Sequence, residues 1–359
     1  MKSNKYCVIM AGGIGSRFWP ISRKSTPKQF LDILGNGKSL IRSTYERFVN
    51  IIDTENFLVV TNEAYKSLVK REIPELDDSQ ILCEPFGRNT APCIAYAAFH
   101  LKAINPQAEM IVTPSDHIIT NEMHFCEVML QSLDFIKEHS DAMVTVGLQP
   151  TRPDTGYGYI QIAENCGHKL FKAKTFTEKP KLELAEIFIR SGEFFWNSGI
   201  FIWKANTIID AMRLHVPDIY ELFASVENSF NTPREQAAIK NIYTECRAIS
   251  IDFGVMERCD NVYVRCSDFG WSDIGTWGSL YQQLNKDERA NTSGEKLYMF
   301  DTHNCMVKMP KGKVAVIDGL DNYIVVDTDD ALLICPRENE QDIIKYIENI
   351  KFDNGIKYI

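Results

Sequence analysis

The sequence of residues 8–30 is VIMAGGIGSRFWPISRKSTPKQF, and this stretch decides the fold class. The unbroken apolar run at 6–10, which overlaps its start, is typical of a parallel strand that is buried on both faces. The loop that follows is built from small residues, which are Ala11, Gly12, Gly13 and Gly15. Glycines at this place let backbone N–H groups approach a polyphosphate closely. We expect a helix after the loop, whose partial positive charge would favour the same anion.

The same stretch carries two cations and two prolines. Arg17 and Lys28 are suited to phosphate oxygens, and an arginine can bind two of them at once. Pro20 and Pro27 stiffen the chain between them. The spacing fits neither the P-loop pattern GxxxxGK[ST] nor the dinucleotide pattern GxGxxG. A glycine-rich turn after a strand is often only a tight turn, but the added cations and prolines favour a nucleotide phosphate site.

Downstream, apolar runs typical of strands alternate with amphipathic runs typical of helices. The predicted strands lie at 57–61, 110–113 and 143–146, and the predicted helices at 40–51, 63–71, 91–104 and 124–138. This alternation predicts an α/β fold with a mostly parallel, doubly wound sheet that binds ligands at the carboxyl ends of its strands. The glycine loop and the sequence TPSDH at 113–117 both fall at such ends.

The second half of the chain changes character. Strands are predicted at 157–162, 172–178, 199–203 and 261–266, and helices at 182–190 and 204–214. Residues 286–295 are polar and loop-like, which marks the best domain boundary. We therefore predict domains at 1–288 and 289–359, the second built from short β segments and a last helix at 338–350. No regular hexapeptide repeat is visible in it.

Composition restricts the class of protein. With 359 residues, of which 45% are hydrophobic, the chain can bury a large core and a smaller one. The formal net charge of −9 argues against a nucleic acid or an anionic membrane as partner. We expect a cytoplasmic protein, because the sequence has neither a long apolar run nor a signal-peptide pattern. Its ten cysteines include no CxxC pair, so we expect reduced core thiols rather than zinc ligands or disulfides.

Seven motifs together resemble one enzyme family. They are GGIGSRFWPISRKSTPKQF (12–30), EPFGRNTAPCIA (84–95), TPSDH (113–117), TGYGYI (155–160), FTEKP (176–180), WNSGIFIW (196–203) and DFGWSDIGTW (268–277). In this order they are similar to the signatures of the sugar-nucleotide pyrophosphorylases, and specifically of the mannose-1-phosphate guanylyltransferases. The motifs are spread over most of the chain, from residue 12 to residue 277, and the series as a whole is specific to that family.

The resemblance implies a Rossmann-like nucleotidyltransferase fold of the GT-A-like kind, followed by a small C-terminal β domain that is β-helix-like in relatives. It also implies that GTP and mannose 1-phosphate give GDP-mannose and pyrophosphate, by in-line attack on the α-phosphorus. Both reactants are anionic, so positioning and charge neutralisation suffice and no protein nucleophile is needed. A homodimer is compatible with this interpretation.

The resemblance assigns Asp116 and Asp273 to one Mg²⁺ that bridges the phosphates of the two substrates. Two carboxylates together with phosphate and water suit this ion. Taken singly, either aspartate is better explained as a helix cap or a turn residue. Arg17, Lys28 and Lys179 are the expected catalytic cations, with Lys179 on the sugar phosphate. A lysine before a proline could equally lie in a solvated turn.

Glu84 is the expected reader of guanine, because a carboxylate accepts both N1–H and the exocyclic amine, whereas adenine presents an acceptor at N1. Arg88 and Asn89 can bind phosphate, base or ribose, while Thr90 could simply cap the following helix. By resemblance the nucleotide contacts are Ala11, Gly12, Gly13, Gly15, Glu84, Arg88, Asn89 and Ser115. The sugar-phosphate contacts are Gly156, Glu178, Lys179 and Asn197.

Two other interpretations stay open. With the same fold, the chain could use another hexose 1-phosphate or another nucleotide, or it could be a non-catalytic paralogue that only binds GDP-mannose. Retention of both carboxylates and of the cations argues against the paralogue. Some relatives carry a C-terminal phosphomannose isomerase module of the cupin type, and we expect this chain to lack one because residues 289–359 hold no suitable cluster of His and Glu.

Overall fold

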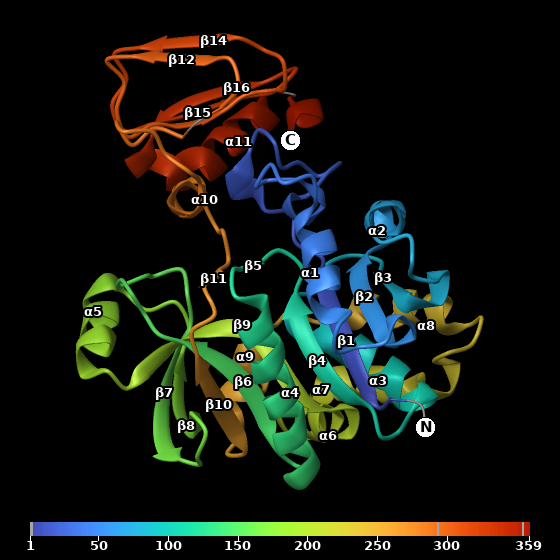
Figure 1. Cartoon of the computed structure of the whole chain (residues 1–359). Coiled ribbons are helices and arrows are strands. Elements are labelled where there is room, and N and C mark those ends of the chain that lie inside the picture. The colour runs from blue at the N-terminus through green and yellow to red at the C-terminus, as the bar shows by residue number, and fades with distance from the viewer. Residues whose placement is uncertain (1–2, 293, 354) are drawn as a thin grey trace. The chain divides into compact units, whose positions relative to one another are not determined.

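The computed structural model describes residues 3–292, 294–353 and 355–359 (Figure 1). These residues form two compact units. The first unit contains Met1–Gly12, Ser43–Ser115 and Ile119–Trp271, and the second contains Gly13–Arg42, Asp116–Ile118 and Ser272–Ile359. Each unit has its own hydrophobic core.

The first unit is built on a nine-stranded sheet whose first half is parallel, as predicted. In this half the strands lie in the order β3 (Ile81–Glu84), β2 (Phe57–Asn62), β1 (Lys5–Ala11) and β4 (Glu109–Pro114). Val8 and Ile9 of β1 are fully buried on opposite faces, which explains the unbroken apolar sequence. Parallel strands end at the same edge of a sheet, so the residues that end β1, β3 and β4 lie at one edge.

The second half of the sheet is largely antiparallel, which differs from the prediction of a mostly parallel sheet. It contains β9 (Phe194–Lys204), β6 (Met143–Leu148), β10 (Val262–Ser267), β8 (Leu170–Thr177) and β7 (Tyr159–Asn165), in this order. β9 runs antiparallel to both β4 and β6, and β7 pairs with β9 as well as with β8, so these five strands close on themselves. The loop at 166–169 between β7 and β8 is too short for the crossover that parallel strands require. The Rossmann-like α/β fold itself is confirmed.

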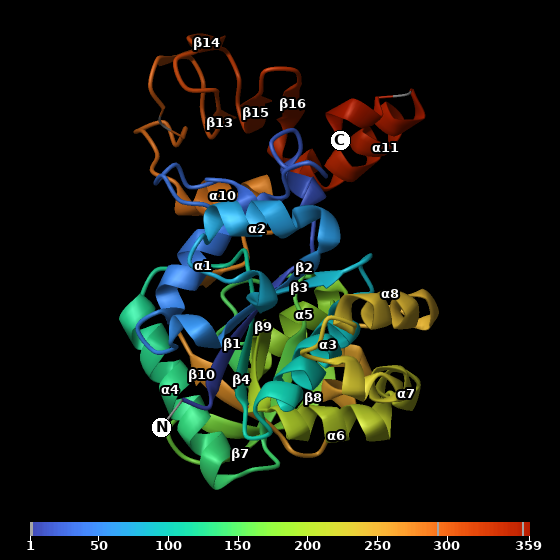
Figure 2. The same ribbon diagram turned by 90° about the vertical axis from the view of Figure 1, so that its right-hand side faces the viewer.

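Helices cover both faces of this sheet (Figure 2). The helix α4 (Glu122–Glu138) lies on one face, and α3 (Thr90–Ile104), α6 (Ala205–His215) and α7 (Pro217–Ser225) pack together on the other. Tyr6 and Val8 of β1 join Phe99 of α3 and Phe223 of α7 in the core on that second face. The predicted helices at 91–104, 124–138, 182–190 and 204–214 are confirmed to within a few residues.

The remaining helices are shorter. They are α1 (Leu40–Phe48), α2 (Lys66–Glu72), α5 (Leu182–Ser191), α8 (Glu235–Glu245), α9 (Ile251–Gly254), α10 (Trp277–Gln283) and α11 (Ile343–Phe352). Among the described residues, no helix is long and apolar enough to cross a membrane.

The helix expected directly after the glycine loop is not formed. The loop continues into a single 3₁₀ turn at Ser16–Phe18, and a second 3₁₀ turn follows at Lys28–Phe30. Trp19 has an extended ψ of 139°, as is typical of a residue before proline, and Pro20 has no N–H to continue a helix. The prediction of a helix dipole at this loop is therefore wrong, and any anion there would be bound by the loop and its side chains.

Residues from both ends of the chain form the core of the second unit. Phe18 and Ile33 cluster with Trp277, Ile324 and Ile343. The rings of Phe18 and Trp277 lie 4.9 Å apart. The second unit is therefore wider than the domain predicted at 289–359, since it also contains residues 13–42. The boundary between residues 288 and 289 stays a prediction.

The C-terminal strands are stacked as in a β-helix. β12 (Leu297–Phe300) pairs in parallel with β14 (Ala315–Asp318), β13 (Met306–Lys308) pairs with β15 (Tyr323–Asp327), and an isolated bridge joins His303 to Asp321. In each pairing the partners are 18 residues apart (315 − 297, 324 − 306 and 321 − 303). One coil of chain therefore stacks on the next without a visible repeat in the sequence. β16 (Leu332–Pro336) pairs with β15 in the antiparallel direction.

Candidate active site

The glycine loop has a shape that side chains fix from within the second unit. Gln29 Nε2 donates a hydrogen bond to the Gly13 carbonyl at 2.9 Å, and Ser22 Oγ donates to the Ile14 carbonyl at 2.6 Å. Gly15 has a φ of 70°, and a Cβ at this position would lie 2.5 Å from the Cβ of Lys28, so only glycine fits. The loop is thus held in one conformation before any ligand binds.

Lys28 links the two predicted metal ligands. Its Nζ donates to Asp116 Oδ2 at 2.9 Å and to the backbone carbonyl of Asp273 at 2.7 Å. The Lys28 side chain is 4% exposed and that of Asp116 is 31% exposed, so Lys28 is buried and Asp116 is partly buried. Burial by itself would raise the pKa of Asp116, but Lys28 and His117 hold this pKa below its usual value. The second unit therefore brings Lys28, Asp116 and Asp273 together.

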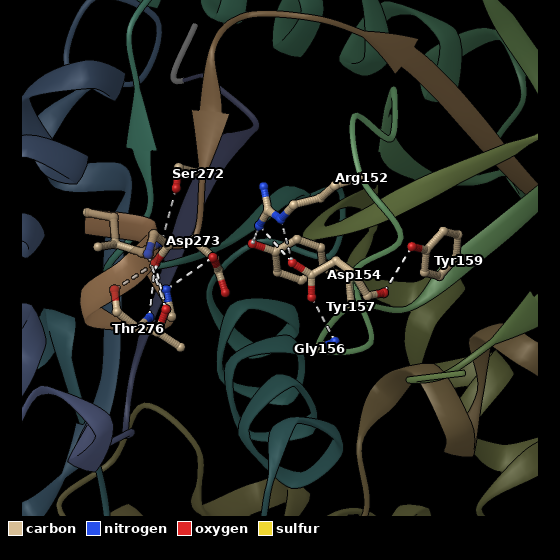
Figure 3. A network of polar contacts seen from close by, with 11 residues as sticks. Arg152, Asp154, Gly156, Tyr157, Tyr159, Ser272, Asp273 and Thr276 are labelled. Atoms are coloured by element: carbon tan, nitrogen blue, oxygen red, sulfur yellow. Dashed lines mark hydrogen bonds and ion pairs between the residues drawn. The ribbon is translucent and has the colours of Figure 1, made fainter. Parts of the chain in front are cut away.

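Asp273 lies in a strained turn. Its Oδ1 accepts a hydrogen bond from the Gly275 N–H at 3.1 Å, and the Ile274 N–H donates to Ser272 Oγ at 3.3 Å (Figure 3). Ile274 has a φ of 40°, which is an outlier for a β-branched residue. Strain of this kind clusters at functional sites, so the backbone supports the assignment of Asp273 to the site.

The donor set of Asp116 and Asp273 fits Mg²⁺ in its chemistry. Both carboxylates are hard oxygen donors, and Mg²⁺ commonly binds proteins through one or two carboxylates plus substrate phosphates and water. In the described part of the chain, no group of three or more His, Cys, Asp and Glu side chains could hold a metal ion. A metal at this place would therefore depend on oxygen atoms from a substrate as well as on the protein.

Three further residues of the predicted nucleotide site occupy distinct positions. Arg17 is exposed, and its Nε donates to Gln341 Oε1 at 3.2 Å. Ala11 and Ser115 are buried at the ends of β1 and β4, where the Ala11 carbonyl accepts from Thr61 Oγ1 at 2.8 Å. Arg17 is therefore accessible to solvent, whereas Ala11 and Ser115 are buried, and the contacts of all three with a nucleotide stay predictions.

Glu84 ends β3 and is only 4% exposed. Its Oε1 accepts a hydrogen bond from the Tyr243 hydroxyl at 2.8 Å, and a Cβ on Gly12 would lie 3.4 Å from its Oε2. Burial raises the pKa of Glu84 to about 7, and the hydrogen bond from Tyr243 opposes this rise. Burial thus brings the pKa of this carboxyl group from the acidic range close to neutral pH, a property that the motif did not indicate.

The other residues of the EPFGRNTAP motif contact neighbouring segments of the same chain. Asn89 Oδ1 accepts from the Thr90 N–H at 2.8 Å and caps α3, so the interpretation of Thr90 as the cap is wrong. Thr90 Oγ1 accepts instead from the Ile251 N–H at 2.8 Å. The Arg88 guanidinium lies 4.7 Å from the centre of the Phe86 ring. Arg88 and Asn89 therefore have structural partners, and their contacts with a nucleotide stay predictions.

Strand register brings three motifs of the predicted sugar side together in the first unit. Tyr159 of TGYGYI pairs with Thr177 on β8 and with Trp196 on β9. Glu178 and Lys179 follow Thr177 at once, and their side chains form an ion pair. Lys179 is exposed and has a φ of 46°, which a lysine rarely adopts. Register therefore explains why motifs far apart in sequence could act on one substrate.

Gly156 lies in a loop that Asp154 organises (Figure 3). The Gly156 N–H donates to Asp154 Oδ1 at 2.8 Å, and Arg152 holds Asp154 Oδ2 through Nε at 3.0 Å and a terminal nitrogen at 2.7 Å. The Tyr159 hydroxyl donates to the Asp154 carbonyl at 2.9 Å. The Gly156 N–H is thus already used within the loop, and its predicted contact with the sugar stays a prediction.

The sequence analysis did not identify three residues that lie near the predicted site. Gly158 lies close to Glu178, since a Cβ there would lie 2.5 Å from Glu178 Oε2, and the second glycine of TGYGYI could have signalled it. Tyr243 contacts Glu84, and Asp252 accepts a hydrogen bond from Asn197 Nδ2 at 2.6 Å. These partners are 159 and 55 residues apart in sequence, and no local pattern points to them.

Comparison with known proteins adds an independent line of argument. Residues 6–290 match the family described as Nucleotidyl transferase, and residues 296–350 match the MannoseP isomerase/GMP-like beta-helix domain. A Salmonella montevideo protein named mannose-1-phosphate guanylyltransferase is 36% identical over 361 residues, which cover 98% of this chain and 75% of that protein. A Klebsiella pneumoniae protein of the same name is 35% identical with the same coverage. The crystal structure of a Thermus thermophilus protein, named mannose-1-phosphate geranyltransferase, is similar to this structure with a TM-score of 0.86. The two sequences are 28% identical, and the match covers 97% of this chain and 100% of that one.

Proposed function

Because the chain belongs to the nucleotidyl transferase family and its relatives are mannose-1-phosphate guanylyltransferases, we propose that it makes GDP-mannose and pyrophosphate from GTP and mannose 1-phosphate. The reaction forms a bond from a phosphate oxygen of mannose 1-phosphate to the α-phosphorus of GTP. It breaks the bond from that phosphorus to the oxygen that leaves with pyrophosphate. The β-helix match at 296–350 supports a relationship along most of the chain.

The observation that carries this proposal is the position of Lys28. Its buried ammonium is held by Asp116 and by the Asp273 carbonyl, so a cation suited to a triphosphate is oriented before the substrate binds. Pre-oriented charge stabilises a transition state without the cost of reorganisation. Arg17 would add a second cation that can bind two phosphate oxygens. In the first unit, Lys179 would bind the sugar phosphate and Glu178 would accept hydrogen bonds from sugar hydroxyls.

We further propose that Asp116 and Asp273 hold one Mg²⁺. When bound, this ion would neutralise phosphate charge at the reacting centre. Lys28 would keep Asp116 ionised, since the ion pair at 2.9 Å favours the carboxylate form.

A direct assay tests the activity. Pyrophosphate release is measured with each common nucleoside triphosphate, with mannose 1-phosphate or glucose 1-phosphate, and with or without Mg²⁺. We expect GTP with mannose 1-phosphate to give the highest kcat/KM, and only when Mg²⁺ is present. Higher efficiency with another pair would reassign the substrate, and binding of GDP-mannose without any turnover would favour the non-catalytic paralogue.

The first prediction concerns Glu84 and pH. Only the ionised carboxylate accepts both guanine donors, and burial raises the pKa of Glu84 to about 7, so kcat/KM for GTP should rise as pH increases through about 7. Glu84→Gln removes this group and should lower kcat/KM for GTP by about five- to a hundredfold. It should also bring kcat/KM for GTP closer to kcat/KM for ITP, because the base of ITP lacks the exocyclic amine.

Tyr243→Phe tests the same prediction through the hydrogen-bond partner of Glu84. It removes the hydroxyl that donates to Glu84 Oε1 at 2.8 Å and favours the ionised form, so the rise with pH should move to higher pH. The terminal phosphate of GTP also changes protonation near this range, but equally for every variant. An unchanged ratio of GTP to ITP efficiencies in Glu84→Gln would show that Glu84 does not read the base.

The second prediction separates the two substrates. Lys179→Ala should raise the KM for mannose 1-phosphate by about tenfold or more, because a charge-assisted hydrogen bond to phosphate is lost, and should change the KM for GTP little. Lys181→Ala, which alters another exposed lysine two residues later, should change neither value. Equal rises in both KM values for Lys179→Ala would contradict the assignment.

A further inference from the structure

Asp252 fixes the side-chain amide of Asn197 within the first unit. Asp252 Oδ1 accepts from Asn197 Nδ2 at 2.6 Å, while Asn197 Oδ1 accepts from the Gly199 N–H at 3.2 Å and lies 3.2 Å from Thr145 Oγ1, whose single proton can go either to it or to the Ile200 carbonyl. This set of partners excludes a flipped amide, since a flip would face oxygen to carboxylate and NH₂ to N–H. The amide nitrogen carries two protons, and the second is the one that Asn197 can offer to a sugar hydroxyl.

The backbone just before Asp252 forms hydrogen bonds with the EPFGRNTAP motif. The Ile251 N–H donates to Thr90 Oγ1 at 2.8 Å, and the Ile249 N–H donates to the Arg88 carbonyl at 3.3 Å. The Ile249 carbonyl in turn accepts from the Ala91 N–H at 3.0 Å. Residues 249–252 therefore contact a nucleotide motif at one end and a sugar motif at the other.

Asp252 faces a charged neighbourhood. Burial raises the pKa of Asp252 to about 6, the Glu178 carboxylate adds to this rise, and the hydrogen bond from Asn197 and the Lys179 ammonium oppose it. Glu257 is the other nearby carboxyl group, and its pKa is raised by burial, by Asp252 and by Glu178. The pKa of Asp252 thus lies between the usual range of an aspartate and neutral pH.

We propose that Asp252 is a positioning residue for mannose 1-phosphate, which holds Asn197 in the orientation that donates to the sugar and links it to the EPFGRNTAP motif. This inference rests on the proposed function, because it takes mannose 1-phosphate as the ligand of Asn197. In this proposal Asp252 acts through Asn197, whose amide donates to its Oδ1.

The test compares KM values in two Asp252 variants. Asp252→Ala should raise the KM for mannose 1-phosphate by about tenfold and leave the KM for GTP and kcat within about twofold, because the lost contact orients only a sugar ligand. Asp252→Asn keeps an acceptor and should bring the KM for mannose 1-phosphate back to within about threefold of the original value.

A pH profile adds a readout that a merely structural role would not change. In the unaltered protein the KM for mannose 1-phosphate should rise as pH falls through about 6, because a protonated Asp252 is a weaker acceptor for Asn197. Asp252→Asn has no proton to gain at this position and should show a smaller rise, because only the substrate phosphate, whose second pKa is about 6, then takes up a proton. Because the alanine variant could fold poorly, the asparagine profile tests the proposal alone, and a rise in Asp252→Asn as large as in the unaltered protein overturns it.

Thr90 offers a second, distant variant. Thr90→Val removes the acceptor for the Ile251 N–H and should raise the KM for mannose 1-phosphate by about threefold, whereas Thr90→Ser keeps the hydroxyl and should not. Proportional losses with both substrates in the Asp252 variants would overturn the positioning role while the unaltered protein still makes GDP-mannose. An unaltered protein that makes none would instead overturn the proposed function, and this inference with it.

Discussion

Replacing Asp116 or Asp273 by asparagine is expected to lower turnover by at least about a hundredfold. Asparagine keeps the size of the side chain but removes the negative charge that would hold Mg²⁺, and misplacing that ion costs several kcal/mol of transition-state stabilisation. The two variants differ in their effect on Lys28. Asp116→Asn removes the anionic partner of Lys28 at 2.9 Å, whereas Asp273→Asn leaves the backbone carbonyl that accepts from Lys28 at 2.7 Å.

This difference makes the pair informative. Asp273→Asn should raise the Mg²⁺ concentration needed for half-maximal rate with Lys28 still in place, and Asp116→Asn should lower the use of GTP as well. Asp134→Asn on α4, an exposed residue that pairs with Lys137 at 3.0 Å, is the control and should retain normal rates. Thermal melting checks that each variant folds. Normal Mg²⁺-dependent rates in both variants would remove the two aspartates from the proposed metal site.

The parts of the fold that could be predicted are those whose burial shows in the pattern of apolar residues along the sequence. β1 and its parallel neighbours are covered on both faces, so their runs are apolar throughout. The direction of a neighbouring strand leaves no such trace, because a strand buried on both faces is apolar whichever way its partner runs. For this reason the antiparallel course of β9 could not be predicted. The absence of a helix after Gly15 was in principle visible, because Pro20 limits what can follow.

The residues of the candidate site likewise fall into two groups, those that the sequence indicates and those that only the tertiary fold brings to the site. Lys28, Asp116 and Asp273 lie in short motifs, and the structure brings them together. Tyr243 and Asp252 lie on helices or their ends and meet Glu84 and Asn197 only through the tertiary fold. The raised pKa of Glu84 likewise arises from burial, which no motif encodes. Residues that touch a ligand are therefore more accessible to sequence analysis than the residues that orient them or set their charge.

Lys28→Met is expected to lower kcat/KM for GTP by about a hundred- to a thousandfold, which is the usual loss when one pre-oriented donor is removed from a charge-stabilising site. Methionine retains most of the side-chain volume, which matters because Lys28 is buried against Gly15 and its Nζ lies 5.5 Å from the centre of the Phe18 ring. The variant should also raise the pKa of Asp116, since the ion pair that lowers it is lost.

Steady-state kinetics with each substrate varied in turn separates this role from a general loss of structure. If Lys28 acts on the triphosphate, the loss should fall on GTP, and the KM for mannose 1-phosphate should change little. Lys24→Met alters an exposed lysine of the same unit and should have no effect. Equal losses with both substrates, in a variant that melts at the original temperature, would mean that Lys28 serves chiefly to hold Asp116 and Asp273. The two variants Lys28→Met and Asp116→Asn would then show closely similar defects, because each breaks the same 2.9 Å contact from one side.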